Sequence, residues 1–486
     1  MTRVLQVSAE LFPLLKTGGL ADVAGALPAA LAAAGAEPRL LVPGFPAIRD
    51  SLTLECAVVP VALPWSEGRA ALLRGRLPGF DMPVYVLDAP GLFDRPGNPY
   101  ADESGVAYAD NHRRFALLGL AAARLAEGVD AAWRPQIVHA HDWHAGLACA
   151  HIAASRSRRR TEARTVFTVH NLAYQGLFPA DHFCDLGLPP QHYAVEGVEF
   201  YGQVSFMKAG LHFADAITTV SPSYAREIQT PEQGCGLDGL LRHRAEVLHG
   251  ILNGVDYGVW SPAHDRSIAR AYDVDSAEDK AVCKAALQRE CGLDVKAQAP
   301  LFGVVSRLTE QKGLPLVIEA LNDLIDAGGQ LVILGSGDAR LEAAFGEAAA
   351  RHPGQIARRI GMDEGLAHRI YAGSDVMLVP SRFEPCGLTQ LYGLSYGTLP
   401  LVHRVGGLAD TVVDCTLEDL DAGAATGFVF NAFTADAYRR ALRRAFALWS
   451  RQECWGRVRL AAMRQHFDWN AAAQRYADVY RGVLGH

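Results

Sequence analysis

The stretch KTGGLAD, Lys16 to Asp22, follows a short apolar run at residues 3–8 (RVLQVS) and precedes an alanine-rich stretch at 21–34. An apolar run, a glycine turn and a helical stretch in this order are typical of the βα unit of a parallel sheet. Gly18 and Gly19 carry no Cβ atom, so backbone N–H groups there can approach an anion. The helix N-terminus and the ammonium group of Lys16 would add positive charge. The stretch therefore predicts an α/β fold with an anion-binding turn.

The pentapeptide GGLAD at 18–22 occurs a second time at 406–410, again after an apolar run, at 399–402. An ordinary strand-to-helix turn with a solvated lysine would explain a single Gly-Gly pair. The repetition favours a chain built of two similar halves. At 486 residues the chain also exceeds what one hydrophobic core usually serves, so we expect two domains.

The composition is typical of a globular enzyme, with 50% hydrophobic and 20% charged residues. A net charge of −7 argues against nucleic-acid partners and against an anionic membrane surface, and the basic run at 156–160 (RSRRR) is expected to be a solvated loop. The apolar stretch at 24–36 contains Pro28 and is too short to span a bilayer, and no targeting segment is visible. The sequence carries no signature of a particular oligomeric state.

Two residue types are distributed in an informative way. Nine cysteines are spread singly without a C-x-x-C pair, which predicts a reduced, cytoplasmic protein without a disulfide or zinc framework. Only six of the 46 basic residues are lysines, and two of these, Lys16 and Lys312, lie in glycine-containing motifs. A lysine retained where arginine dominates suggests a need for a compact ammonium group.

Apolar runs alternate with helical patterns through both halves, which predicts two doubly wound parallel sheets. In the first half we expect strands at 39–42, 84–87, 136–140, 164–169, 216–220 and 247–252, helices at 107–126, 145–154 and 222–228, and a hairpin at 56–77. Turn residues at 253–256 (NGVD) and a polar loop to about 277 mark a boundary. In the second half we expect strands at 301–306, 330–334, 375–380 and 399–402, and helices at 314–327, 339–350, 387–396, 435–449, 452–466 and 469–483.

The predicted domains are therefore a Rossmann-like domain at 1–252, a second one at 253–455, and C-terminal helices at 456–486. Strands of such domains end at a binding crevice, so two of them would share a cleft that suits a two-part ligand.

The run His139-Ala140-His141-Asp142-Trp143-His144 ends one predicted strand. A dinuclear hydrolase pattern, H-x-H-x-D-H, would need aspartate where Trp143 stands, so we expect no metal and instead expect Asp142 in the crevice with structural histidines. His170 and Asn171 end the next strand, which favours contact with a polar substrate over a purely structural histidine.

In the second half, the segment 306–313 (SRLTEQKG) is the counterpart of the first glycine turn. Arg307 and Lys312 are placed to meet phosphate oxygens at a helix N-terminus. Gly335 belongs to another tight turn, at 335–338 (GSGD), that suits the edge of a nucleotide.

The segment 381–390 (SRFEPCGLTQ) places a carboxylate, Glu384, just before a predicted helix. Glu384 can accept from sugar hydroxyls while the N–H groups of Gly387 to Thr389 meet phosphate or hydroxyl oxygens, although a mere capping carboxylate would have the same pattern. A nucleophilic role for Cys386 lacks an adjacent base.

Together these motifs closely resemble the bacterial glycogen synthases and plant starch synthases, retaining glycosyltransferases of the GT-B architecture. The resemblance runs in order across both halves: KTGGLADV (16–23), HDWHAGL (141–147), TVHNLAYQG (168–176), TVSPSYAREI (219–228), GCGLDGLL (234–241), NGVD (253–256), SRLTEQKG (306–313) and SRFEPCGLTQLYGL (381–394).

The resemblance implies transfer of glucose from ADP-glucose to the non-reducing 4-hydroxyl of an α-1,4-glucan such as glycogen, with retention and without metal or cofactor. It implies donor contacts from Lys16 and Gly19, diphosphate contacts from Arg307 and Lys312, glucose and phosphate contacts from Glu384, Gly387, Leu388 and Thr389, and a reacting centre lined by Asp142, His170 and Asn253. The expected binding set also takes in Gly18, Asp22, Asn171, Gly335, Met362 and Cys386. The family further implies that the last helix crosses back to the first domain.

One departure from the family concerns the nucleobase. Where these enzymes tend to have an aromatic residue after Ile-Gly, this chain has Met362, which keeps UDP-glucose open as a donor. A catalytically silent glucan-binding homologue, a pyridoxal-phosphate-dependent glucan phosphorylase and a metallohydrolase built on residues 139–144 are the rival hypotheses.

Overall fold

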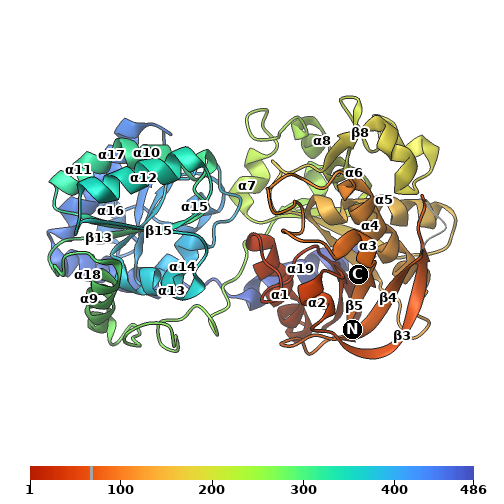
Figure 1. The fold of residues 1–486 in the computed structure, drawn as a ribbon, viewed down its shortest axis with the longest axis horizontal. Coiled ribbons are helices and arrows are strands. Elements are labelled where there is room, and N and C mark those ends of the chain that lie inside the picture. Colours follow the sequence, from red (N-terminus) through yellow and green to blue (C-terminus); the bar gives the residue numbers. More distant parts are fainter. Residues whose placement is uncertain (66–68, 486) are drawn as a thin grey trace. The chain divides into compact units, whose positions relative to one another are not determined.

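A computed structural model of the chain describes residues 1–65 and 69–485 and divides into two compact units (Figure 1). Unit 1 is Met1–Gly254 together with Trp469–His486, and unit 2 is Val255–Asp468. The predicted boundary after residue 252 lies two residues before the observed one. The predicted C-terminal segment 456–486 is divided, because its part up to Asp468 belongs to unit 2 and the rest to unit 1.

Unit 1 is built on a nine-stranded sheet in the order β12-β11-β7-β6-β1-β2-β5-β4-β3. Seven strands run parallel: β1 (Thr2–Val7), β2 (Ala36–Pro43), β5 (Val84–Asp88), β6 (Ile137–His141), β7 (Arg164–Val169), β11 (Ala216–Thr219) and β12 (Leu248–Gly250). The antiparallel pair β3 (Thr53–Ala62) and β4 (Arg69–Arg76) forms one edge, where the hairpin is predicted; residues 66–68 of that prediction lie outside the described residues.

Helices cover both faces of the unit 1 sheet. One face carries α4 (Asn111–Glu127), α5 (Asp142–Ser157) and α6 (Phe206–Phe213), and the other carries α1 (Gly19–Ala33) and α19 (Trp469–Leu484). Alternate residues of β1 divide between the faces, since Leu5 packs in the first cluster and Val4 in the second. Residues 469–484 therefore complete the core of the unit that begins at the N-terminus.

Unit 2 has a six-stranded, fully parallel sheet in the order β15-β14-β13-β16-β17-β18. Its strands are β13 (Leu301–Val305), β14 (Gln330–Gly335), β15 (Ile356–Ile360), β16 (Val376–Val379), β17 (Leu399–His403) and β18 (Phe428–Phe430). Figure 1 shows α10 (Leu314–Glu319), α11 (Leu321–Asp326), α12 (Ala339–Arg351) and α17 (Ala435–Trp449) on one face, and α9 (Lys280–Cys291), α13 (Glu364–Gly373), α14 (Thr389–Ser395) and α18 (Gln452–Met463) on the other.

Both sheets confirm the predicted α/β class with doubly wound parallel strands. The strand order reverses direction between β1 and β6 in unit 1 and between β13 and β16 in unit 2. Ligands of such sheets bind outside the carboxyl ends of the strands at these switch points. No helix in the described parts of the chain is long and apolar enough to cross a membrane.

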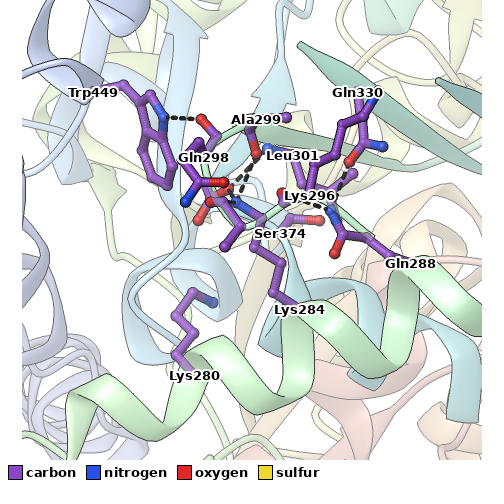
Figure 2. Close-up of polar contacts among 12 residues, drawn as sticks. Lys280, Lys284, Gln288, Lys296, Gln298, Ala299, Leu301, Gln330, Ser374 and Trp449 are labelled. Carbon is purple, nitrogen blue, oxygen red and sulfur yellow. Dashed lines mark hydrogen bonds and ion pairs between the residues drawn. The ribbon is translucent and has the colours of Figure 1, made fainter. Parts of the chain in front are cut away.

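A buried polar stripe on α9 holds the opposite, amino-terminal edge of the unit 2 sheet (Figure 2). Lys280, Lys284 and Gln288 recur every four residues and are all buried. The Lys284 ammonium group binds the Asp375 carboxylate at 2.7 Å, just before β16, and the Gln288 amide donates to Gln330 at the start of β14. This edge of the sheet is therefore structural, and the carboxyl edge is left for ligands.

Candidate active site

The KTGGLAD turn in unit 1 is closed by its own side chains. The buried Glu10 carboxylate accepts the backbone N–H groups of Thr17 at 2.6 Å and Gly18 at 3.2 Å, together with the Thr17 hydroxyl. The expectation that these N–H groups stand open to an external anion is therefore wrong for Thr17 and Gly18. The helix α1 begins at Gly19, two residues earlier than predicted.

Two features of this turn still suit a ligand. The Lys16 ammonium group binds the Asp22 carboxylate at 2.7 Å, and the Lys16 side chain is 27% exposed. A Cβ atom on Gly18 would meet nothing within 4 Å, and its φ of −161° is open to any residue. Since neither packing nor backbone conformation requires glycine at position 18, open space beside the turn is what the glycine provides.

Asp142 lies between the ends of β6 and β7. It begins α5 with a φ of +59°, a conformation that non-glycine residues rarely adopt and that costs free energy. Its Oδ1 accepts the backbone N–H of His170 at 3.1 Å, and the N–H of Asn171 lies 3.5 Å away. Burial raises the pKa of Asp142 to about 7. The predicted residues Asp142, His170 and Asn171 are thus brought together.

His170 is a buried, neutral imidazole at the end of β7. Burial lowers the pKa of His170 to about 3, and its Nε2 atom lies 3.0 Å from Nδ1 of His141. Asn253 stands apart from this group, because no hydrogen bond in the described residues joins it to Asp142 or His170. Its buried Oδ1 atom has no hydrogen-bond partner among the described residues.

A pocket of about 430 Å³ opens beside Asn171 in unit 1. Its lining is largely aromatic and amide, from Trp143, Ala173, Tyr174, Gln175, Gly176, Leu177, Phe200 and Cys235. The Tyr174 side chain is 48% exposed, which is unusual for a large aromatic residue and typical of a binding surface.

In unit 2 the segments after β13 and β16 meet at the switch point. The Lys312 ammonium group binds Oε2 of Glu384 at 2.6 Å, and Ser381 donates to the same oxygen at 2.8 Å. Glu384 is buried, whereas Lys312 is partly exposed and Arg307 is exposed. One of the two predicted phosphate-binding cations, Lys312, therefore contacts a buried carboxylate.

Glycines allow the loops of this edge to pack closely. A Cβ atom on Gly335 would come within 1.9 Å of the Ser306 carbonyl oxygen. The second GGLAD copy opens α15 (Gly406–Thr411), where the N–H of Gly407 donates to the Glu384 carbonyl oxygen at 3.1 Å and a Cβ atom on Gly406 would meet the same oxygen at 2.0 Å. The repeated motif thus supports the backbone of Glu384.

The remaining predicted residues of unit 2 divide by exposure. Cys386 is buried, and Gly387 and Leu388 precede α14, which begins at Thr389 and not at residue 387 as predicted. Gly387 adopts a φ of +73°. Met362 follows β15 and is 82% exposed, so its thioether is available to a flat ring.

The histidine-rich run does not form a metal-binding group. His139 and His141 hydrogen-bond within the interior of unit 1, and His144 stacks on Tyr100 at 4.6 Å between ring centroids. Among residues 1–65 and 69–485 there is no cluster of three or more His, Cys, Asp or Glu side chains that could hold a metal ion. All nine cysteines are thiols.

Sequence reasoning missed Glu10 and its partner Tyr100, whose hydroxyl donates to Glu10 Oε1 at 2.5 Å. The available signal was that Glu10 is the one acidic residue between the first strand and Lys16. It also missed Gln6 and Tyr480, which bind the buried histidines. Tyr480 lies more than 300 residues from these histidines in the chain, and only the fold brings them together.

Comparisons with known proteins cover the whole chain. Residues 3–243 match the family described as the starch synthase catalytic domain, and residues 293–458 match the glycosyl transferases of group 1. The chain is 60% identical to a glycogen synthase of Variovorax paradoxus over 489 residues, with 99% of both chains covered. It is 58% identical to a glycogen synthase of Francisella philomiragia, covering 99% of this chain and 100% of that one.

Solved structures agree with this. The catalytic domain of starch synthase IV from Arabidopsis thaliana, bound to ADP and acarbose, superposes with a TM-score of 0.91 at 30% identity over the full length of both chains. Sucrose-phosphate synthase from Thermosynechococcus elongatus superposes with a TM-score of 0.59 at 18% identity, which reflects the shared fold alone.

Proposed function

The chain belongs to the family of the bacterial glycogen synthases and starch synthases, glycosyltransferases of the GT-B fold, and we propose that it elongates glycogen by transferring glucose from ADP-glucose to the non-reducing 4-hydroxyl of an α-1,4-glucan. The reaction uses no cofactor and no metal in this proposal. The protein acts in the cytoplasm, which its nine thiols support.

The observation that carries the proposal is the contact between Lys312 and Glu384 at the switch point of unit 2. A nucleotide sugar presents a diphosphate beside a sugar, and this pair offers a cation beside a carboxylate within 2.6 Å. The cation is suited to the phosphate and the carboxylate to sugar hydroxyls. The ADP in the Arabidopsis starch synthase supports an adenine nucleotide as the donor.

The leaving group gains negative charge as the sugar–phosphate bond breaks. Arg307 and Lys312 are the cations that meet this charge from unit 2, and Lys16 is the one that unit 1 supplies. Lys16 binds Asp22 and Lys312 binds Glu384. A bound diphosphate competes with Glu384 for the Lys312 ammonium group, so donor binding and repositioning of Lys312 are coupled.

Retention of configuration follows from a front-face route in this proposal. The bond between the sugar C1 and the phosphate oxygen breaks, the acceptor oxygen bonds to C1 on the same face, and the acceptor proton passes to the departing phosphate. Glu384 accepts from Ser381 and Asp142 accepts from the backbone N–H of His170, and the proposed route forms no covalent bond between either carboxylate and C1. The neutral His170 supports the oxocarbenium-like state.

The acceptor glucan occupies unit 1 in this proposal. The aromatic pocket beside Asn171, with Trp143 and the exposed Tyr174, offers the flat apolar surfaces on which sugar rings pack. The acarbose in the Arabidopsis structure supports an oligosaccharide site in this fold.

Met362 favours UDP-glucose as an alternative donor to ADP-glucose. A thioether contacts a nucleobase less directionally than an aromatic ring does, and the 82% exposed Met362 would distinguish adenine from uracil weakly. UDP-glucose is therefore the competing donor, and a catalytically silent glucan-binding protein is the competing function.

The test is glucosyl transfer to glycogen, measured with ADP-glucose and with UDP-glucose in the presence of a chelator. We expect transfer from ADP-glucose at the higher kcat/KM, unchanged by the chelator. Lys16→Ala is expected to lower kcat/KM by about 10² to 10³-fold, because a cation that stabilises the transition state is lost. Lys296→Ala is the matched control, since Lys296 lies on the surface and its ion pair among the described residues is with the exposed Asp294.

Each outcome separates the alternatives. A higher kcat/KM with UDP-glucose would show that UDP-glucose is the donor. Absence of transfer from either nucleotide sugar would favour the catalytically silent glucan-binding protein. Loss of activity with the chelator would overturn the metal-free route. Equal rates for the wild type and Lys16→Ala would remove the role given to Lys16.

A further inference from the structure

A continuous chain of hydrogen bonds runs through the interior of unit 1 from His170 to the C-terminal helix. His170 Nε2 lies 3.0 Å from His141 Nδ1, and His141 Nε2 lies 2.5 Å from Gln6 Oε1. The Gln6 amide nitrogen donates to the Tyr480 hydroxyl at 3.1 Å and lies 3.3 Å from His139 Nδ1. The chain joins β7, β6, β1 and α19.

The chain fixes which nitrogen of each histidine carries the proton. Gln6 Oε1 can only accept, so His141 Nε2 is the protonated nitrogen. In a neutral imidazole the other nitrogen is an acceptor, so His141 Nδ1 accepts the Nε2–H of His170. His170 is then left with its lone pair on Nδ1.

His139 anchors the other side of the Gln6 amide. Its Nδ1 lies 2.8 Å from the Tyr480 hydroxyl and 3.3 Å from the Gln6 amide nitrogen, and because that nitrogen can only donate, Nδ1 is the unprotonated acceptor. Its Nε2–H then donates to Thr168 Oγ1 at 2.6 Å. In this arrangement the amide nitrogen of Gln6 faces the lone pair of His139, and its oxygen faces His141.

The surroundings keep the histidines neutral. Gln6, His139 and His141 are at most 1% exposed, and Tyr480 is equally buried. Burial lowers the pKa of His139 to about 3 and that of His141 well below its usual value. A fully hydrogen-bonded buried network of this kind is rigid, since each member can move only by leaving a buried polar atom unpaired.

We propose that Gln6 is a positioning residue for the active site: its amide, held by Tyr480 of the C-terminal helix and by His139, fixes the Nε2–H tautomer of His141 and through it the orientation and tautomer of His170. The inference rests on the proposed function, in which His170 lines the reacting centre. It assigns a second task to α19, which supplies one hydroxyl to the support of that centre besides covering the sheet.

The experiment combines histidine tautomers with kinetics. Long-range ¹H–¹⁵N spectra of ¹⁵N-histidine-labelled full-length protein report which ring nitrogen is protonated, whether or not the protein is active. We expect His141 and His170 as Nε2–H tautomers in the wild type. In Gln6→Met the acceptor for His141 is lost, so we expect His170 in both tautomers.

The same variant is expected to lower kcat for glucosyl transfer by about 10 to 100-fold, because a misplaced group at the reacting centre slows chemistry. The KM for ADP-glucose should stay within about twofold, since the donor contacts are untouched.

Tyr480→Phe keeps the bond from His141 to Gln6, so we expect a shifted His139 signal and a smaller loss of kcat. Tyr438→Phe removes a buried hydroxyl of unit 2 that has no hydrogen-bond partner among the described residues, and should change neither readout.

An Nδ1–H tautomer of His141 in the wild type would overturn the proposal at once, and needs no variant to fold. An unchanged His170 tautomer in Gln6→Met, or an unchanged kcat despite altered tautomers, would also overturn it. A wild type with the expected tautomers but no glucosyl transfer would instead contradict the proposed function and leave the Gln6 network standing.

Discussion

Asp142 combines a strained backbone with a buried carboxylate, and both cost stability. Burial raises its pKa from 3.8 to about 7, so above pH 7 the folded protein holds a charge that the unfolded chain solvates better. Asparagine tolerates a φ of +59° and can still accept the N–H of His170. We therefore expect Asp142→Asn to be more stable than the wild type at pH 8, by up to about 4 kcal/mol from the three-unit pKa difference.

The expected gain in stability of Asp142→Asn is opposite in sign to the loss that most substitutions cause. As the pH falls from 8 to 5, the folded wild type takes up a proton on Asp142 that the unfolded chain largely does not, so the advantage of the variant should fall to about 1.6 kcal/mol, and it should vanish only below the unfolded-state pKa of 3.8. Thermal unfolding at pH 8 and pH 5 measures it, with the exposed Asp50→Asn as control. A stability difference that does not depend on pH would contradict the raised pKa. Activity should fall in the same variant, as expected where strain is retained for function.

The lysines show how far single residues can be interpreted without a structure. The scarcity of lysine pointed to a need for compact ammonium groups, and the motifs accounted for Lys16 and Lys312. Three other lysines also require a compact ammonium group, but for a structural reason. The buried ammonium groups of Lys208, Lys280 and Lys284 each donate to several backbone carbonyl oxygens. Which backbone oxygens converge is a property of the fold, so composition alone cannot separate these lysines from the predicted site.

At the scale of elements, α9 is tied to its sheet by charge. Lys284→Met would leave the Asp375 carboxylate buried without its cation, and breaking a buried pair in this way typically costs about 3–5 kcal/mol. Lys296→Met is the matched control, because its pair with Asp294 has side chains 56% and 55% exposed, and such pairs contribute about 0–1 kcal/mol. Urea unfolding of both variants checks this. Equal losses would mean that α9 is held by packing alone.

The elements that sequence patterns predicted well are those with long apolar runs or strong amphipathic periods. The strand β7 and the helix α17 have the predicted bounds. The edge strand β15 escaped prediction because its second half, Arg358 to Ile360, faces partly outward. The helix predicted at 314–327 is two helices that meet at Ala320. Edge position and local breaks depend on neighbours that lie elsewhere in the chain.

At the scale of the whole molecule, buried histidines concentrate in unit 1. Burial lowers the pKa of His151 to about 4 and those of His139 and His170 to about 3, and it also lowers the pKa of His141 and His144. The unfolded chain binds these protons near pH 6.5, so folding stability is lost as the pH falls below 6.5. Each histidine lowers the free energy of unfolding by about 1.4 kcal/mol for every pH unit of acidification in this window. Asp142 has a raised pKa and acts in the opposite direction, so it offsets the loss from one histidine.

We therefore expect acid to unfold unit 1 before unit 2. Pulse proteolysis in urea at pH 7.5 and pH 5 can follow each unit by its own peptides. The urea concentration that releases peptides of unit 1 should fall more between the two pH values than the one for unit 2. An equal fall for both units would show that the buried histidines do not govern the acid response.

The discontinuity of unit 1 has a consequence for the order in which the protein is made. Its β-sheet is synthesised first, yet the helix that covers Val4, Leu27 and Ile137, α19, follows the whole of unit 2. At the usual 5–20 residues per second, translation of Val255–Asp468 leaves the part of that apolar face beneath α19 uncovered for about 10–40 s. During this interval unit 2 can fold before unit 1 is complete, and the exposed apolar surface of unit 1 is where the nascent chain is prone to aggregate.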